Sequence, residues 1–122
     1  MGAALKDDQS AVRRAALATL DASDPQAAAA VIALLEVEPD WALRALAAET
    51  LGRVAAGTAS APAVTALSQR ASKDAFALVR EAALEALVLV DPTAAKRVLQ
   101  VSHDNDPEPR VKAKAQALLQ RL

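Results

Sequence analysis

One pattern of residues occurs four times along the chain, and it constrains the fold more than any other feature of the sequence. In the third copy Val79 is followed by Ala83 four residues later and by Leu87 eight residues later. On a helix this spacing places the three side chains on one apolar stripe. An acid, Asp74, stands five residues before Val79, and Arg80 follows Val79 directly. The pattern therefore predicts a helix that has an acid just before its start and a cation in its first turns.

The other three copies keep a residue of the same class at every one of these positions. We call the first residue of each stripe the anchor; the anchors are Val12, Leu43, Val79 and Val111, so they lie 31, 36 and 32 residues apart. In these three copies the acids five residues before the anchor are Asp7, Glu38 and Asp106, and the cations directly after it are Arg13, Arg44 and Lys112. The alanines four residues after the anchor are Ala16, Ala47 and Ala115, and the leucines eight residues after it are Leu20, Leu51 and Leu119. A period of this length indicates a solenoid of stacked helical repeats.

Each conserved class within the pattern has a physical reason. An alanine in the middle of the stripe lets neighbouring helices approach closely, and the larger residues beside it fill the layers between repeats. The acid before the helix suits its positive end. The cation one residue after the anchor is placed to reach the acid of its own repeat or of an adjacent repeat. Stacked repeats would then carry a structural ladder of acid–base pairs.

The pattern resembles the HEAT-repeat family, in particular the short bacterial HEAT-like repeats of the phycobilisome-lyase type. The resemblance rests on an acid, five residues, then a cation, as in Asp74 and Arg80, followed by alanine and leucine down the helix. Glu38, Leu43 and Lys112 depart from the family's preferred residues. We expect these departures to weaken the ladder at their copies without affecting the fold. The resemblance implies an all-α, right-handed α-α superhelix of about 3.5 two-helix repeats and seven helices.

Turn residues divide the chain into one lone helix and three full repeats. Residues 1–22 hold a lone N-terminal helix of the second type, and residues 24–55, 60–90 and 92–122 are the full repeats. Helix starts are expected at Asp24-Pro25, Ser60 with Pro62, and Asp91-Pro92, because an oxygen-bearing cap followed by proline suits the first turn. The lone helix either caps the array or indicates that this single domain is the end, or a fragment, of a larger protein.

The composition of the chain excludes several classes of protein function. A length of 122 residues suits one domain, and a net charge of −1 with mixed signs argues against a nucleic-acid partner. The chain has no cysteine, so thiol catalysis is excluded. No apolar run is long enough to cross a membrane, and no signal peptide is visible, so we expect a cytoplasmic protein without a membrane partner.

Candidate catalytic and metal-binding groups are sparse. The single histidine, His103, lies beside Asp104 and Asp106, but a metal site needs more ligands, so a solvated turn is the better interpretation. Glu81 and Glu85 lie four residues apart on the side away from the apolar stripe, which favours a solvated face over a pair of catalytic carboxylates. We expect no enzyme activity, no metal and no cofactor.

The concave face of a HEAT array is lined by the second helices, and it carries one large aromatic residue here. Helical phase places Trp41 off the apolar stripe, where it either contacts a partner or packs over an adjacent helix end. Phe76 falls close to the stripe and is expected in the core. The expected partner-binding residues are Trp41, Arg14, Ala45, Glu49, Glu81, Glu85 and Val88.

These residues favour a non-catalytic scaffold for protein–protein interaction that uses the concave face and binds a protein partner. The alternative is an accessory subunit or chaperone that positions a cofactor or substrate for a partner enzyme, as in the lyase-like HEAT relatives.

Overall fold

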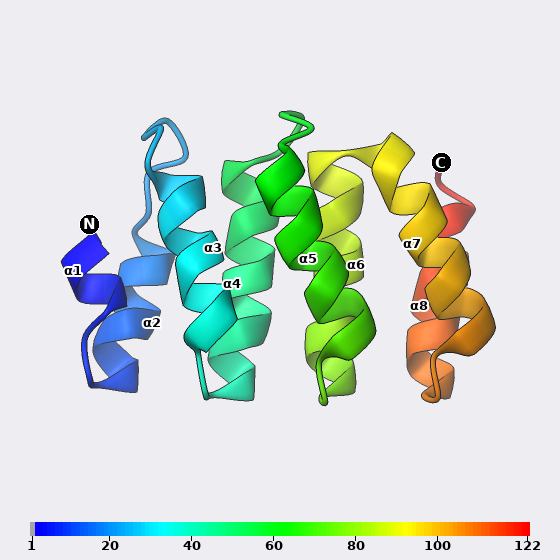
Figure 1. Ribbon diagram of the computed structural model, residues 1–122, viewed down its shortest axis with the longest axis horizontal. Helices are drawn as coiled ribbons and strands as arrows, with labels where there is room; N and C mark the ends of the chain where they lie inside the picture. The colour runs from blue at the N-terminus through cyan, green and yellow to red at the C-terminus, as the bar shows by residue number, and fades with distance from the viewer. Residues whose placement is uncertain (1) are drawn as a thin grey trace.

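The computed structural model describes residues 2–122, and within them the chain forms eight helices and no strand. The helices follow one another in a row along the longest axis (Figure 1). Their bounds are α1 Gly2–Leu5, α2 Ser10–Ala18, α3 Ala27–Val37, α4 Trp41–Val54, α5 Ala61–Lys73, α6 Ala77–Val90, α7 Pro92–Asn105 and α8 Pro109–Leu119. None of the described helices is long and apolar enough to span a membrane.

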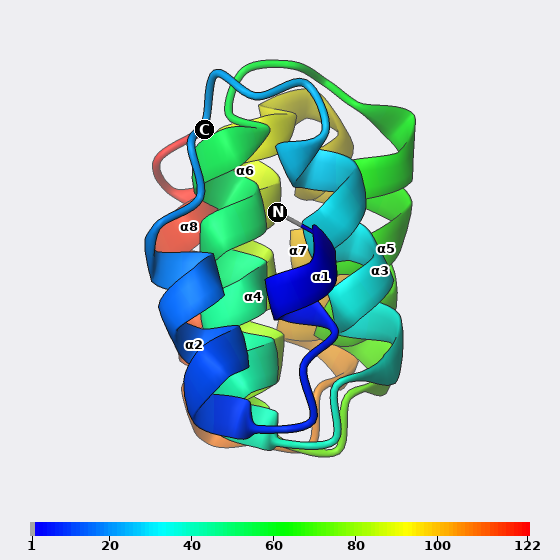
Figure 2. The ribbon, with the colours of Figure 1, turned by 90° about the vertical axis from the view of Figure 1, so that its left-hand side faces the viewer.

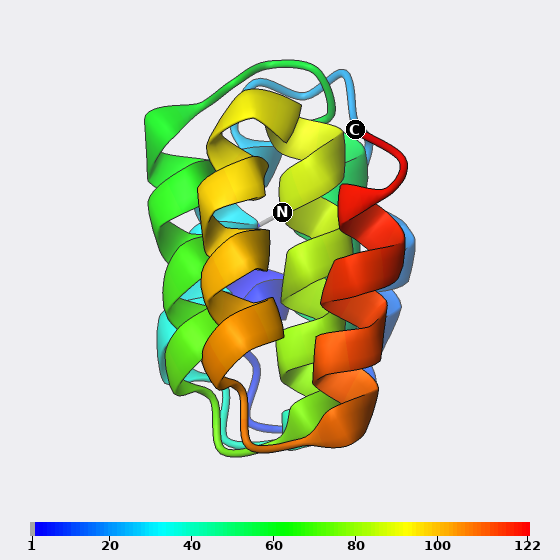
Figure 3. The same cartoon turned by 90° about the vertical axis from the view of Figure 1, so that its right-hand side faces the viewer.

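The helices form two layers, which the end-on views separate clearly (Figures 2 and 3). The first helices α1, α3, α5 and α7 form one layer, and the second helices α2, α4, α6 and α8 form the other. The turns within repeats lie at one edge, and the connections between repeats lie at the opposite edge (Figure 1). The connections from α2 to α3 and from α4 to α5 are long, whereas only Asp91 separates α6 from α7. The predicted all-α solenoid of two-helix repeats is confirmed.

The seven predicted helices are present, and a one-turn helix, α1, precedes them. The predicted lone helix is also shorter than expected, because α2 begins at Ser10 and ends at Ala18. The carboxylate of Asp7 accepts a hydrogen bond from the backbone N–H of Gln9, and Gln9 itself is extended, so the helix starts only after it.

Two of the three predicted helix starts are confirmed. The side chain of Ser60 accepts a hydrogen bond from the N–H of Ala63, and the side chain of Asp91 accepts one from the N–H of Ala94. The predicted N-cap at Asp24 is wrong, because Gln26 holds that position and Pro25 lies before the helix, which spans Ala27–Val37. The Asp24 carboxylate instead accepts from the N–H of Gln26 and closes a turn before the helix.

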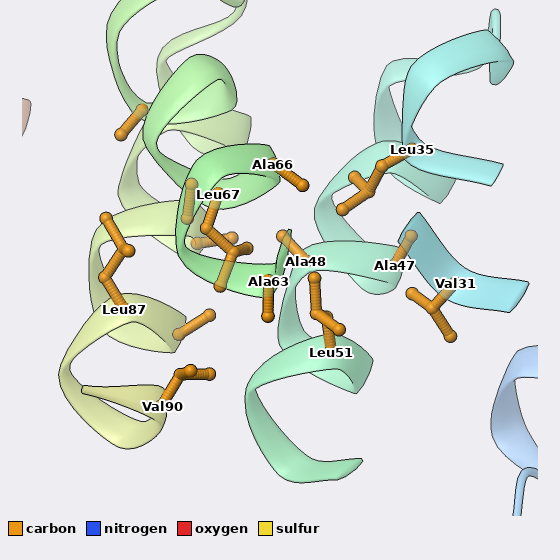
Figure 4. Packing of buried hydrophobic residues seen from close by; sticks show 14 of the residues in the cluster. Val31, Leu35, Ala47, Ala48, Leu51, Ala63, Ala66, Leu67, Leu87 and Val90 are labelled. Atoms are coloured by element: carbon orange, nitrogen blue, oxygen red, sulfur yellow. The ribbon is translucent and has the colours of Figure 1, made fainter. Parts of the chain in front are cut away.

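The core lies between the two layers and is built from small and aliphatic residues. Side chains from α3, α4, α5 and α6 meet in it (Figure 4). Ala47, Ala83 and Ala115 are fully buried, whereas Ala16, at the same position in the first repeat, is only partly buried. The second helices α4 and α6 approach each other closely at Gly52, where an added Cβ would lie 2.8 Å from the Cβ of Ala86. The small residues therefore set the spacing between repeats.

Candidate functional site

A ladder of ion pairs runs along the edge that carries the turns within repeats. In its middle step the Nε of Arg44 lies 2.8 Å from Oδ2 of Asp74, and its Nη2 lies 3.2 Å from Oδ1. The cation of one repeat thus forms a two-pronged pair with the acid of the following repeat. The same arrangement joins Arg13 to Glu38 and Arg80 to Asp106.

Each arginine of the ladder also contacts its own repeat, through the backbone and not through the acid side chain. The Nη1 of Arg44 donates to the carbonyl oxygen of Glu38 at 3.0 Å, and the Nη1 of Arg80 donates to that of Asp74 at 2.9 Å. Sequence spacing left open whether the cation reaches its own or an adjacent repeat. One guanidinium does both, because its fork offers several donors in fixed directions.

The two ends of the ladder differ from its middle. The Asp7 carboxylate accepts from a backbone N–H, as the other three acids do, and Asp7 is exposed. Lys112 is exposed, and within residues 2–122 it forms no ion pair. Lysine lacks the guanidinium fork that serves two partners at once.

The ladder lowers the pKa of its central acid, Asp74. Burial by itself raises the pKa of Asp74, but the hydrogen bonds from Arg44 and from the N–H of Phe76 lower it, as do the charges of Arg44 and Arg70. The lowering contributions prevail, so the pKa of Asp74 lies below its ordinary value of 3.8.

The aromatic pair formed by Trp41 and Phe76 lies at the start of two adjacent second helices. The two rings are stacked, with centroids 5.4 Å apart and planes inclined by 12°. Trp41 remains 38% exposed and Phe76 44% exposed. The guanidinium carbon of Arg44 lies 5.8 Å from the centroid of the Phe76 ring. Trp41 therefore packs over the start of a neighbouring helix and still presents ring surface to solvent. Its contact with a partner stays a prediction.

The prediction that Phe76 belongs to the core is wrong. Phe76 is the N-cap residue of α6, and its backbone is extended, with φ −106° and ψ 127°. Counting 100° per residue back from Val79 applies only inside the helix. The stacking of Trp41 on Phe76 could not be predicted from Trp41 either, because Phe76 belongs to the following repeat.

The two predicted solvated glutamates lie against α8. Glu81 is buried, and its Oε2 lies 2.6 Å from Nε of Arg110 without the alignment of a hydrogen bond. Glu85 forms an ion pair with Lys114 and is partly buried. The solvated-face interpretation is wrong for Glu81, because the cations of α8 cover this side of α6.

The remaining predicted partner-binding residues are spread over α2, α4 and α6. Arg14 and Glu49 are exposed, while Ala45 and Val88 are partly buried. With Glu81 and Glu85 paired, Glu49 is the one acid of the predicted set that is exposed. The second helices are thus less acidic on their exposed side than expected, and they expose the aromatic pair together with Leu78 and Leu89 of α6.

His103 lies in the last turn of α7, not in the connection that follows. Its Nδ1 lies 3.0 Å from Oδ1 of Asp104, and this contact, with one from Gln100, lowers the pKa of Asp104. Asp106 points to Arg80 instead. Across residues 2–122 no three histidine, cysteine or acidic side chains are grouped to hold a metal ion.

A groove beside α1 was not foreseen from the sequence. It has a volume of about 730 Å³. Its lining combines apolar residues with charged and polar ones: Leu5, Ala29, Ala30, Ala33, Leu34, Val37 and Pro39, and Lys6, Asp7, Asp8, Arg13, Gln26 and Glu38. Val37 is 76% exposed, the largest value for a large hydrophobic residue in the described chain.

A comparison with protein-family models matches the chain to HEAT repeats over residues 1–88 and again over residues 29–120. Comparisons with curated proteins and with solved structures found no significant match. Because the two overlapping matches together cover residues 1–120, the chain belongs to the HEAT-repeat family.

Proposed function

We propose that the chain is a non-catalytic protein–protein interaction module and that its partner docks over the aromatic pair on the second-helix layer. HEAT repeats generally mediate protein–protein interactions, which supports the class of function. The aromatic pair supports the location, and it is the observation on which the proposal rests.

Stacked aromatic rings suit a docking surface for a physical reason. Tryptophan and arginine are enriched among the residues that contribute most to binding, and aromatic rings bury a large area at a small cost in side-chain entropy. The rings of Trp41 and Phe76 hold one another in place, and Arg44 is fixed beside them by Asp74. A partner therefore meets a rigid apolar surface with a cation at its edge.

The surroundings of the pair favour a partner that offers an apolar group at the centre of its contact. Arg14 and Glu49 are exposed on the same layer of helices and have opposite charges. Exposed charges around an apolar centre mainly affect the rate and the specificity of association. The proposed partner thus inserts an apolar side chain at the aromatic pair and places polar groups around it.

The experiment compares three variants for the proteins that they capture from the source cell. Trp41→Ala and Phe76→Ala each remove one ring, and Val101→Ala removes an exposed apolar side chain from α7, in the other layer. A protein retained by the wild type and by Val101→Ala, but lost by both ring variants, is then purified. We expect its Kd to rise about tenfold or more for each ring variant.

Circular dichroism at matched concentration checks that all three variants keep the helical content of the wild type. Two results contradict the proposal. One is a partner that binds the ring variants as tightly as the wild type; the other is a loss of binding that is equally large for Val101→Ala.

A further inference from the structure

The acids of the third and fourth repeats differ in the number of cations that they bind. Asp74 pairs with two arginines, since Nε of Arg44 lies 2.8 Å from its Oδ2 and Nη1 of Arg70 lies 3.5 Å from the same oxygen. Within residues 2–122 Asp106 pairs with one arginine, Arg80, whose Nε and Nη2 lie 2.8 and 3.1 Å from the two carboxylate oxygens. The fourth repeat therefore lacks one cation that the third repeat has.

Ser102 occupies the position of the missing cation. Arg70 stands four residues before Asp74 in the last turn of α5, and Ser102 stands four residues before Asp106 in the last turn of α7. Beside Ser102 lies a pocket of about 270 Å³, which we call the Ser102 pocket. Its walls are the last turns of α5 and α7, the turn after α7, and Arg80. The pocket lies between two complete repeats, at the position that corresponds to the Arg70 guanidinium of the third repeat.

Two acceptors in the Ser102 pocket have capacity for a further hydrogen bond. Oδ2 of Asp106 accepts from Nε of Arg80, whereas Oδ2 of Asp74 accepts from two arginines. Ser102 is only 5% exposed, and among residues 2–122 its hydroxyl forms no hydrogen bond. A polar group that is buried without a partner costs free energy, so a donor placed between these two oxygens would be favourable.

The charges around the Ser102 pocket favour a cation. Its charged lining consists of two acids, Asp74 and Asp106, and one cation, Arg80. The pocket also lies at the C-terminal ends of α5 and α7, and such helix ends carry a partial negative charge. The last turn of α5 holds two cations, whereas that of α7 holds a histidine alone. The presence of Arg80 is compatible with a second cation, since Asp74 accepts two arginines in the same arrangement.

The size and shape of the Ser102 pocket suit one long side chain. Its volume of about 270 Å³ is below the roughly 300–1,000 Å³ that drug-sized ligands occupy. Ala71, Val101 and Pro107 add apolar surface, against which the methylene groups of a cationic side chain can pack. A planar guanidinium offers several donors in fixed directions and can serve Asp106 and Ser102 at once, whereas an ammonium group is a point charge.

We propose that the Ser102 pocket binds the guanidinium group of an arginine side chain that a partner protein supplies. The guanidinium donates to Oδ2 of Asp106 and to Oγ of Ser102, and its methylene groups pack on Ala71 and Pro107. The bound arginine takes the place that Arg70 holds beside the acid of the third repeat. The site is separate from the aromatic pair and does not rest on it.

The probe is arginine blocked at both ends, titrated into the isotope-labelled full chain, with backbone amide signals followed by NMR. We expect saturable shifts at Ser102, Asn105 and Asp106. Blocked citrulline, which has a similar shape but no charge, should give none. Guanidinium chloride distinguishes a free ion from a side chain, and it should bind about tenfold more weakly because it lacks the methylene groups. Absence of saturable shifts with arginine, or equal binding of either control compound, would overturn the proposal.

Variants that exchange residues between the two repeats test the same site from the protein side. Ser102→Arg supplies a guanidinium from the chain itself and should abolish binding, whereas Ser102→Ala removes one acceptor and should weaken it severalfold. Arg70→Ser combined with Lys73→Asn gives the third repeat the residues of the fourth, and should produce a second set of saturable shifts around Asp74.

Val101→Ala is the matched control, because it keeps both acceptors and should leave the arginine-dependent shifts in place. Circular dichroism checks that each variant keeps the helical content of the wild type. Binding of arginine to the Ser102→Arg variant as tight as to the wild type would overturn the proposal.

Discussion

Arg44 and Asp74 are 30 residues apart in sequence and form a two-pronged ion pair across the boundary between two repeats, with an Nε–Oδ2 distance of 2.8 Å. The side chain of Arg44 is 12% exposed and that of Asp74 is 1% exposed. A pair that is shielded to this degree loses little strength to solvent, and removal of one partner leaves the other charge nearly buried. The pair therefore couples the packing of one repeat to the next.

A double-mutant cycle on this pair should show strong coupling. Arg44→Gln and Asp74→Asn should each lower the free energy of unfolding by about 1–3 kcal/mol, because each removes the two-pronged pair from a nearly buried charge. After Arg44→Gln, the only ion pair left to Asp74 is the longer contact with Arg70, at 3.5 Å. The double variant should lose clearly less than the sum of the two. Urea unfolding at neutral pH measures all three values.

The control cycle combines Asp74→Asn with Arg80→Gln. Arg80 contacts the carbonyl oxygen of Asp74 and the carboxylate of Asp106, but not the Asp74 carboxylate, so the two losses should add within about 0.5 kcal/mol. Coupling in the Asp74–Arg80 cycle as large as in the Asp74–Arg44 cycle would contradict the geometry of the ladder.

Acid should weaken the ladder at Asp74. The pKa of Asp74 is lower in the folded protein than in the unfolded chain, so the stabilisation is present above the unfolded value of 3.8 and is lost as pH falls through the folded value. The stability difference between the wild type and Asp74→Asn should therefore shrink below about pH 4. Urea unfolding at several pH values between neutral and acid measures it; a constant difference would contradict the prediction.

Gly52→Ala should destabilise the protein although alanine favours helices. In an exposed helix this change stabilises by about 1 kcal/mol. Here the new Cβ would lie 2.8 Å from the Cβ of Ala86 and 2.9 Å from its Cα, so backbone must move. We expect a net loss of about 1–3 kcal/mol, as in other overpacked cores. Glu49→Ala, exposed on the same helix, should change the urea midpoint little.

The alanine in the middle of the stripe should not tolerate a larger side chain. Ala83 is fully buried, so Ala83→Leu forces extra volume between repeats and should cost about 1–3 kcal/mol. Ala117→Leu adds the same volume at an exposed position of α8 and serves as the control. Equal urea midpoints for the two variants would show that the alanine position is not close-packed.

The architecture could be predicted well from the sequence, because the pattern of one structural unit occurs four times in it. Val79, Ala83 and Leu87 on one stripe determine the buried side of a helix, and the acid and the cation around the anchor indicate where repeats meet. Which acid pairs with which cation could not be predicted, because it depends on the offset between adjacent repeats. That offset is set by close contacts such as Gly52 with Ala86.

The candidate site was less predictable, since it depends on residues that lie outside helices or belong to different repeats. Phe76 was misplaced because it precedes its helix, and Glu81 because Arg110 approaches it from the following repeat. The groove beside α1 is lined by residues of two repeats, and the 76% exposure of Val37 depends on how these repeats pack, which the sequence does not show.

Fluorescence of Trp41 tests the proposed docking surface most directly, because it is the only tryptophan and the chain has no tyrosine. In the free protein Trp41 is 38% exposed, so its emission should be readily quenched by acrylamide, and Phe76→Ala should increase the quenching. Addition of a purified partner without tryptophan should shift the emission to the blue and lower the quenching constant severalfold. An emission maximum and a quenching constant that stay unchanged when the partner is bound would contradict docking on the aromatic pair.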